Sequence, residues 1–128
     1  MTGYRAPQPG PDGEPFFAAA AEGRLLIKRC GDCGKAHYYP RPLCPFCFSA
    51  ETRWEAASGR ATIYSLSTMR RGPAAPYTLA YVQLEEGPAV LTNILTGDHD
   101  GLRIGQSVAI CFSPSDGGPP VPTFRPVD

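Results

Sequence analysis

Four of the chain's five cysteines form two close pairs. Cys30 and Cys33 make one Cys-x-x-Cys pair, and Cys44 and Cys47 make a second one after ten intervening residues. Four thiolates at this spacing can surround one ion as a tetrahedral shell, and Zn²⁺ is the usual occupant of such a shell. Because four cysteines complete the tetrahedron, no position remains for water or substrate. The pattern therefore predicts a structural zinc site and not a catalytic one.

Two other uses of these cysteines stay open. Iron accepts the same four sulfur ligands. Disulfides would need an oxidising compartment, and the N-terminal Met1-Thr-Gly-Tyr-Arg5 lacks the apolar segment of an export signal. We therefore expect a cytoplasmic protein with a reduced cluster, in which His37 between the pairs is solvated or hydrogen-bonded. Cys111 is expected as a buried strand residue without an activated thiolate.

Outside the cysteines, the sequence contains few residues suited to catalysis. It has no Gly-x-Ser-x-Gly, His-Glu-x-x-His or P-loop motif. His99 lies in the segment 97–101, Gly-Asp-His-Asp-Gly, whose residue types favour a solvated turn. We therefore predict that this chain carries no catalytic residue of its own.

Arg70 and Arg71 are the strongest candidates for holding a phosphorylated ligand. They begin a Gly- and Pro-rich segment that is expected to be a loop between two strands, and guanidinium groups suit phosphate oxygens. Lys35 and Arg41 are weaker candidates. A solvated or ion-paired arginine loop fits the sequence equally well.

The charge of the chain argues against a nucleic acid as its partner. Twelve Lys and Arg residues balance 12 Asp and Glu residues, so the formal net charge is zero. Domains dedicated to nucleic acids normally carry a strong basic footprint. No apolar run approaches the ~20 residues that span a bilayer, so we expect no membrane partner either.

The N-terminal part of the chain is expected to form a short segment ahead of the zinc ribbon. Residues 1–23 are expected to form an arm and a short helix at about 13–22, with Asp12 as N-cap, Pro15 in the first turn and Gly23 after the last. Phe16 and Phe17 of this helix are expected either to pack on their own domain or to meet a partner.

Residues 24–52 are expected to form the zinc ribbon itself. In its second knuckle, Phe48 takes the place that Gly34 occupies in the first. Glycine suits the left-handed backbone that follows such a cysteine pair, so Phe48 predicts either strain or an altered turn.

Residues 53–128 are expected to form a mainly β domain with a C-terminal tail. Runs of strand-forming residues separated by turn signals lie at 53–57, 61–68, 76–84, 89–95 and 107–113, the first two being read as one long strand bent at Ser58-Gly59. About five short strands favour a closed five-stranded, OB-like barrel, with a small sandwich as the alternative. Tyr77, Leu79 and Tyr81 share one face of their strand and either line a ligand surface or pack.

The order of several segments resembles a known family. A Glu-Gly-Arg-Leu-Leu segment at 22–26 leads into the first knuckle, and Pro-Arg-Pro-Leu-Cys-Pro-Phe-Cys at 40–47 holds the second. Ser-Gly-Arg-Ala-Thr-Ile-Tyr-Ser at 58–65 and Pro-Thr-Phe-Arg-Pro at 122–126 follow. Together they resemble the acyl-CoA-associated family that joins a rubredoxin-like zinc ribbon to an OB fold, long catalogued as a domain of unknown function. Phe17, where the family often carries Trp, and Phe48 depart from its pattern.

This resemblance implies a partner and a pathway class that composition does not reveal. Such proteins are similar to accessory subunits of thiolase-like enzymes, including thiolases and the acyl-CoA aldolases of steroid side-chain breakdown. In those assemblies the catalytic residues belong largely to the thiolase-like partner, and the accessory subunit stabilises it and helps form or shield the acyl-CoA site. A zinc-ribbon/OB protein that binds single-stranded nucleic acid, and a stand-alone acyl-CoA-binding protein or thioesterase, remain the alternatives.

Overall fold

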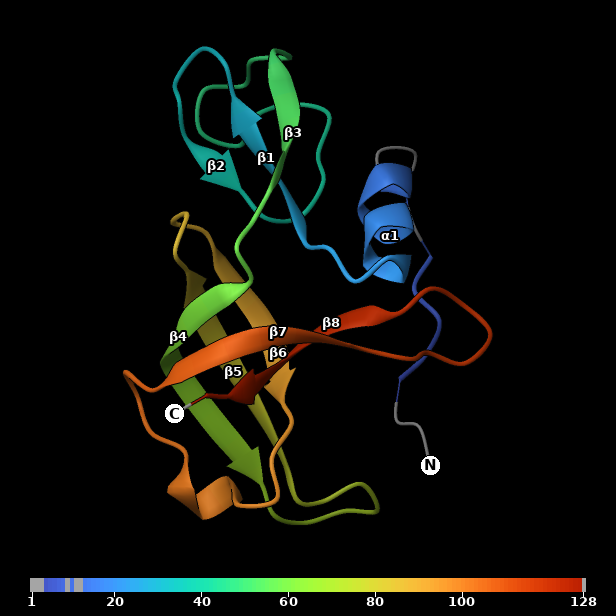
Figure 1. The fold of residues 1–128 in the computed structure, drawn as a ribbon, viewed down its shortest axis with the longest axis vertical. Coiled ribbons are helices and arrows are strands. Elements are labelled where there is room, and N and C mark those ends of the chain that lie inside the picture. The colour runs from blue at the N-terminus through green and yellow to red at the C-terminus, as the bar shows by residue number, and fades with distance from the viewer. Residues whose placement is uncertain (1–3, 9, 11–12, 128) are drawn as a thin grey trace.

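The computed structural model describes residues 4–8, 10 and 13–127. These residues form one short α-helix, α1 (Glu14–Ala21), a three-stranded sheet that carries the cysteine pairs, and a closed five-stranded barrel. Figure 1 shows the small sheet above the barrel, with α1 beside the junction between them. The expected mainly β architecture, with a short helix, a zinc ribbon and an OB-type barrel, is confirmed.

The ends of helix α1 follow from its local sequence. Pro15 lies in the first turn, where a missing amide hydrogen costs little. Gly13 is the N-cap, and Asp12, the expected cap, lies outside the described residues. At the other end Gly23 adopts φ 80°, and its amide donates to the carbonyl of Ala20 at 2.9 Å. This left-handed glycine ends the helix as expected.

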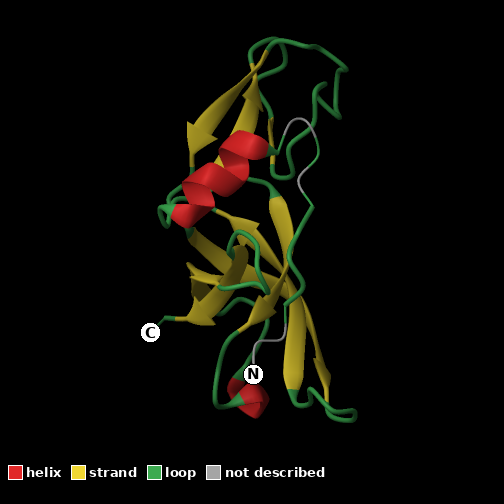
Figure 2. Ribbon diagram, turned by 90° about the vertical axis from the view of Figure 1, so that its right-hand side faces the viewer, coloured by secondary structure: helices red, strands yellow, loops and turns green. Residues whose placement is uncertain are grey.

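The apolar side of α1 packs within the same chain. Phe16 and Phe17 are both buried, and their rings meet edge to face with centroids 4.9 Å apart. Phe16 also contacts the ring of Tyr38 from the ribbon. Figure 2 shows α1 lying across the region where the ribbon meets the barrel. Of the two uses expected for these phenylalanines, the structure favours packing within the chain.

The ribbon is a small antiparallel sheet in the order β2-β1-β3. Its strands are β1 (Leu26–Cys30), β2 (Ala36–His37) and β3 (Thr52–Ala56). Lys28 of β1 lies between His37 of β2 and Trp54 of β3. The first knuckle connects β1 to β2, and the second lies in the long connection from β2 to β3.

The barrel closes in the order β4-β5-β6-β8-β7. Its strands are β4 (Arg60–Met69), β5 (Tyr77–Leu84), β6 (Ala89–Ile94), β7 (Ser107–Ser113) and β8 (Val121–Pro126), and the short 3₁₀ helix η1 (His99–Gly101) follows β6. All neighbours are antiparallel except β6 and β8, which run parallel. Closure leaves no long unpaired edge, as an OB fold requires.

Two expectations about individual strands were wrong. Residues 53–57 and 61–68 do not form one bent strand, because β3 belongs to the ribbon and β4 to the barrel. Gly59 makes the turn between them with φ 85°, and a Cβ there would lie 2.5 Å from Cγ2 of Ile110. The fifth barrel strand is β8, for which no strand was expected.

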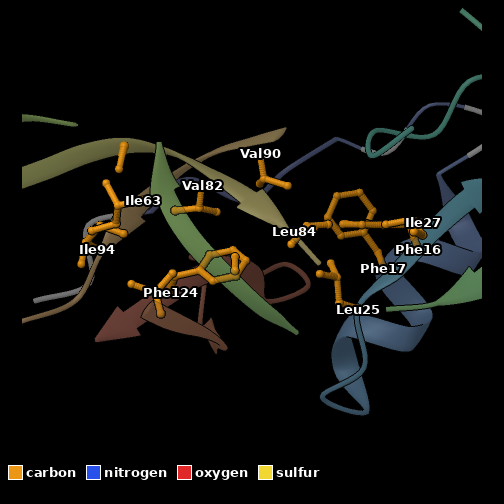
Figure 3. Packing of buried hydrophobic residues seen from close by; sticks show 13 residues of the cluster. Phe16, Phe17, Leu25, Ile27, Ile63, Val82, Leu84, Val90, Ile94 and Phe124 are labelled. Atoms are coloured by element: carbon orange, nitrogen blue, oxygen red, sulfur yellow. The ribbon is translucent and has the colours of Figure 1, made fainter. Parts of the chain in front are cut away.

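One hydrophobic core joins the helix, the ribbon and the barrel. Leu84 of β5 belongs to the same buried cluster as Phe17 of α1 and Leu25 at the start of the ribbon. Figure 3 shows these side chains at one end of the cluster and Phe124 of β8 nearer the barrel interior. Among the described residues, no helix is long and apolar enough to cross a membrane.

Candidate metal centre and surrounding surfaces

The structure brings the two cysteine pairs together at one end of the ribbon. The four sulfur atoms of Cys30, Cys33, Cys44 and Cys47 all lie within 4.8 Å of one another. Sγ of Cys30 is 3.6 Å from Sγ of Cys47, and Sγ of Cys33 is 3.7 Å from Sγ of Cys44. All four thiols are free, so neither pair forms a disulfide. Sulfur atoms at these separations can surround a single ion.

The two knuckles have the same backbone geometry. The amide of Gly34 donates to the carbonyl of Cys30 at 3.0 Å, and the amide of Phe48 donates to the carbonyl of Cys44 at 2.8 Å. Gly34 has φ 78° and Phe48 has φ 65°. The second knuckle therefore keeps the turn of the first, and Phe48 accepts a left-handed conformation that is unfavourable for a bulky residue. Of the two expected outcomes, strain is the one observed.

Backbone amides in both knuckles point at sulfur atoms. The amides of Asp32 and Cys33 lie 3.3 and 3.4 Å from Sγ of Cys30, and the amide of Phe46 lies 3.4 Å from Sγ of Cys44. Such N–H···S contacts stabilise a thiolate more than a thiol, and they hold each sulfur in position. The knuckles thus supply the surroundings that metal-bound thiolates need.

The pKa values of two cysteines in the cluster shift in opposite directions. The amides of Cys33 and Asp32 outweigh burial and lower the pKa of Cys30 to about 7. The amide of Ser49 lowers the pKa of Cys47, but lost hydration and the three neighbouring sulfurs outweigh it and raise that pKa to about 12. Four crowded thiolates repel one another, and a divalent ion removes this repulsion.

The donor set fits a structural zinc ion. Four thiolates around one ion complete a tetrahedral shell and leave no open position for a substrate. Cys30 and Cys44 are buried at the base of the cluster, while Cys33 and Cys47 are exposed. When zinc is bound, it supplies a crosslink among the end of β1, the β1–β2 turn and the β2–β3 connection, in a ribbon whose own core is small.

His37 does not occupy the position expected from the sequence. It is buried, and neither ring nitrogen has a hydrogen-bond partner in the described chain. The pKa of His37 is lowered by burial and by the nearby charges of Lys28 and Arg41. The expectation of a solvated or hydrogen-bonded residue was wrong, because β2 turns this side chain inward. A two-residue strand gives too little alternation for the sequence to show this.

The candidate ligand-binding arginines lie where they were expected, in the loop between β4 and β5. The guanidinium of Arg70 forms an exposed ion pair with Asp100 at 2.6 Å. Arg71 is exposed and has no hydrogen bond or ion pair within the described chain. Lys35 lies over the ring of Phe46, and Arg41 is exposed on the ribbon. The phosphate-binding role of these residues stays a prediction.

The structure forms one polar contact near η1 that the sequence did not predict. Nδ1 of His99 lies 2.9 Å from Oγ1 of Thr78, which is 2.7 Å from Oγ1 of Thr68. A hydroxyl beside an imidazole is the arrangement of an activated nucleophile. Thr78 is fully buried, however, so its hydroxyl cannot meet a substrate. The contact instead holds η1 against β4 and β5.

The remaining residues singled out from the sequence lie on barrel strands. Tyr77 and Tyr81 are exposed on the outer face of β5, with Leu79 half-buried between them. Cys111 lies on β7, as expected, but it is half-buried, and its Sγ is 3.6 Å from Oγ1 of Thr123. The tyrosines therefore face solvent and do not line the core.

Family models match most of the chain in two adjoining parts. Residues 17–53 match the model described as "ChsH2, rubredoxin-like zinc ribbon domain". Residues 54–113 match the model described as "ChsH2, C-terminal OB-fold domain". The match boundary falls within β3, between the two cysteine knuckles and the barrel.

Three curated relatives share about a third of their aligned residues with the chain. A "probable enoyl-CoA hydratase alpha subunit" of Thermomonospora curvata is 33% identical over 87% of this chain, which spans only 36% of that protein. A "DUF35 domain-containing scaffold protein" of Methanocaldococcus jannaschii is 30% identical over 69% of this chain and 67% of its own length. The "benzoylsuccinyl-CoA thiolase subunit BbsA" of Geobacter metallireducens is 33% identical over 67% of this chain and 60% of its own length.

A solved structure is similar to the whole chain. A chain of the "Ltp2-ChsH2(DUF35) aldolase" superimposes with a TM-score of 0.82 at 32% identity, and the match covers 94% of this chain and 98% of that one. Ribbon, helix and barrel therefore recur together in a protein of nearly the same extent.

Proposed function

The chain belongs to the family that joins a rubredoxin-like ChsH2-type zinc ribbon to an OB-fold domain, and from this premise we propose that it is a non-catalytic accessory subunit of a thiolase-like, acyl-CoA-processing complex. The observation that carries the proposal is the full-length likeness to a chain of an Ltp2-ChsH2 aldolase. A thiolase subunit and a scaffold protein among the relatives support it. The acyl group, which includes steroid-derived and other lipid substrates as candidates, is set by the partner.

The lack of a usable catalytic group supports the accessory role. In the described part of the chain, the one hydroxyl beside an imidazole is that of Thr78, which is buried. The cysteine cluster has no open coordination position for Lewis-acid chemistry once four thiolates are bound. Cys30, Cys33, Cys44 and Cys47 are thus proposed as zinc ligands that maintain the fold. Free thiols in every described cysteine are consistent with a cytoplasmic location.

Arg70 and Arg71 are proposed to contact the phosphates of CoA at the edge of the complex. Both are exposed in the β4–β5 loop, and Arg71 has no competing partner in the described chain. The ion pair of Arg70 with Asp100 lies in solvent, so exchanging the carboxylate for a phosphate costs little. In this role the chain helps form the acyl-CoA site without taking part in the chemistry.

Nucleic-acid binding is less well supported by the barrel surface. OB folds bind single strands with aromatic residues and cations on the same face. The outer face of β5 carries Tyr77 and Tyr81, but no Lys or Arg lies between Tyr77 and Leu84. Without cations to meet phosphates, stacking alone gives a weak site.

Affinity purification of the full chain from its native host tests the proposal. We expect the tagged protein to retain a thiolase-like protein, identified by mass spectrometry. We also expect the isolated chain to lack thiolase, aldolase and thioesterase activity, and the reconstituted pair to process an acyl-CoA. Turnover by the isolated chain, or the absence of any thiolase-like protein from the purified material, would refute the accessory role.

A further inference from the structure

We propose that the outer face of β4, β5 and β6 is the surface that docks the thiolase-like subunit, and that it meets an uncharged, apolar surface of that subunit. This inference rests on the proposed function and deepens it by naming the interface. The surface, here called the tyrosine face, consists of Tyr64, Tyr77, Leu79, Tyr81, Leu91 and Leu95.

Strand register brings these side chains together. Tyr81 of β5 is paired with Leu91 of β6, and Ser65 of β4 is paired with Tyr81 on its other side. The register shifts between Ile63 and Ser65, and the intervening Tyr64 is exposed beside this row. Residues in such rows lie about 5 Å apart across a sheet. Tyr81 and Leu91 thus lie side by side, and Leu79, between Ser67 and Asn93, continues the same face of β5 toward Tyr77.

The tyrosine face is unusually exposed for an apolar surface. Tyr64 and Leu91 are 67% and 56% exposed, and Tyr77, Tyr81 and Leu95 are also exposed. Four of the ten exposed large hydrophobic residues described in the chain therefore lie on three neighbouring strands, and Leu95 directly follows the last of these strands. A clustered apolar patch marks an interaction site, whereas scattered apolar residues do not.

Charged residues are absent from the centre of this face and present at its two ends. Between Thr62 and Met69 of β4, along Tyr77–Leu84 and along Ala89–Ile94, every described residue is uncharged. At one end Arg60 pairs with Glu85 at 2.9 Å, and at the other Arg70 pairs with Asp100 at 2.6 Å. An uncharged centre that exposes tyrosines and leucines, bounded by charged pairs, has the anatomy of a protein–protein interface.

The composition of the face also selects the chemistry of its partner. A nucleic acid or the phosphates of CoA would need cations at the centre, and the face has none. The hydroxyls of Tyr64, Tyr77 and Tyr81 make no hydrogen bond within the described chain, so they can pair with backbone or neutral polar groups of a protein. An acidic or basic partner surface would lose its hydration here without gaining an opposite charge. A neutral protein surface fits best.

The opposite side of the barrel is partly covered by the chain itself. The amide of Asp116, in the β7–β8 connection, donates to the carbonyl of Tyr4 at 3.1 Å. A Cβ on Gly118 in the same connection would lie 2.6 Å from Cβ of Ala6. Figure 1 shows the N-terminal segment running beside this connection. The tyrosine face has no such cover in the described chain.

Charge insertion into the face tests the inference. Tyr81→Glu and Leu91→Glu each place a carboxylate at the centre of the patch, at an exposed position that tolerates it in the free chain. Binding is measured by titration calorimetry against the purified thiolase-like subunit that the wild-type chain retains. We expect each variant to bind at least ~30-fold more weakly, the loss expected at an interface hot spot. Zinc content and melting temperature should stay at wild-type values.

Ala18→Glu is the matched control, because it adds the same charge to an exposed residue of α1. It should bind as the wild type does. Wild-type affinity in both face variants would overturn the inference and leave the proposed function standing. A wild-type dimer that both variants convert to a monomer, seen by light scattering, would assign the face to a second copy and also overturn it. Failure of the wild type to retain any thiolase-like protein would instead refute the proposed function and, with it, this inference.

Discussion

Phe48 shows how one residue can be unfavourable for the fold that contains it. It holds φ 65° and is 74% exposed, whereas Gly34 holds φ 78° at the same place in the first knuckle. A left-handed conformation costs about 1–2 kcal/mol for a residue with a Cβ. Because the ring of Phe48 is exposed, its packing offsets little of this cost. The sequence already indicated this conflict, because the two knuckles can be aligned on their cysteines.

We predict that Phe48→Gly stabilises the zinc-loaded protein by roughly 0.5–1 kcal/mol. Relief of the left-handed strain exceeds the extra unfolded-state entropy of glycine, which is about 0.5–1 kcal/mol. Equilibrium unfolding in urea with excess zinc measures the change. Gly34→Ala is the reciprocal control and should destabilise the protein by about 1 kcal/mol. An unchanged or lower stability of Phe48→Gly would show that the Phe48 ring packs favourably.

His37 provides the second prediction at this scale. Burial and the charges of Lys28 and Arg41 lower its pKa in the folded chain. Near pH 6 the side chain of His37 is therefore protonated more fully in the unfolded chain than in the folded chain. The free energy of unfolding consequently decreases as the pH falls below the unfolded pKa of about 6.5. We predict that His37→Leu flattens the dependence of the unfolding free energy on pH between 7.5 and 5.5.

Comparison with the wild type isolates the histidine, because zinc release from the cysteines affects both proteins. Parallel curves for the wild type and His37→Leu would mean that His37 binds a proton equally well in the folded and the unfolded chain. The inward orientation of this residue was not predictable from the sequence, since burial of a single polar side chain depends on packing between distant segments.

At the scale of elements, regular patterns in the sequence predicted most of the architecture. Alternation in β5 and β6 and the cysteine spacing led to the correct strands and cluster. The last strand was missed because it contains Pro122 and Pro126, and proline normally argues against a strand inside a sheet. The bend at Gly59 was seen, but local sequence does not show that the chain changes sheets there.

The ribbon should depend on its metal more than the barrel does. The barrel has its own buried residues, including Ile63, Val82 and Phe124, whereas the ribbon is held mainly by the cysteine cluster. We predict that removal of zinc by a chelator, or Cys44→Ser, abolishes hydrogen-exchange protection in β1 and β3 while β5 and β6 stay protected.

Cys111→Ser is the control, because it removes a cysteine that lies outside the cluster. It should leave ribbon protection and zinc content unchanged. If the amides of β1 and β3 keep their protection after zinc is removed, then backbone pairing alone stabilises the ribbon. In that case the metal would have a role other than holding the fold.

At the scale of the whole molecule, α1 acts as the connection between ribbon and barrel. Its side chains belong to the cluster that contains Ile27 of the ribbon and Leu84 of the barrel. This coupling makes the relative position of the two sheets a property of the core and not of a linker. A partner that docks on the barrel thus also meets a ribbon in a defined place, which suits a subunit that shapes a neighbouring active site.

Phe16 is the residue on which this coupling should depend most, since it is 1% exposed and contacts Phe17 and Tyr38. We predict that Phe16→Ala lowers the unfolding free energy by about 3–5 kcal/mol and splits one calorimetric transition into two, the ribbon melting first. Tyr39→Ala is the control, because it removes a neighbouring but exposed ring. A single transition in Phe16→Ala would place the coupling in the β3–β4 turn. Two transitions in the wild type would mean that ribbon and barrel already unfold independently.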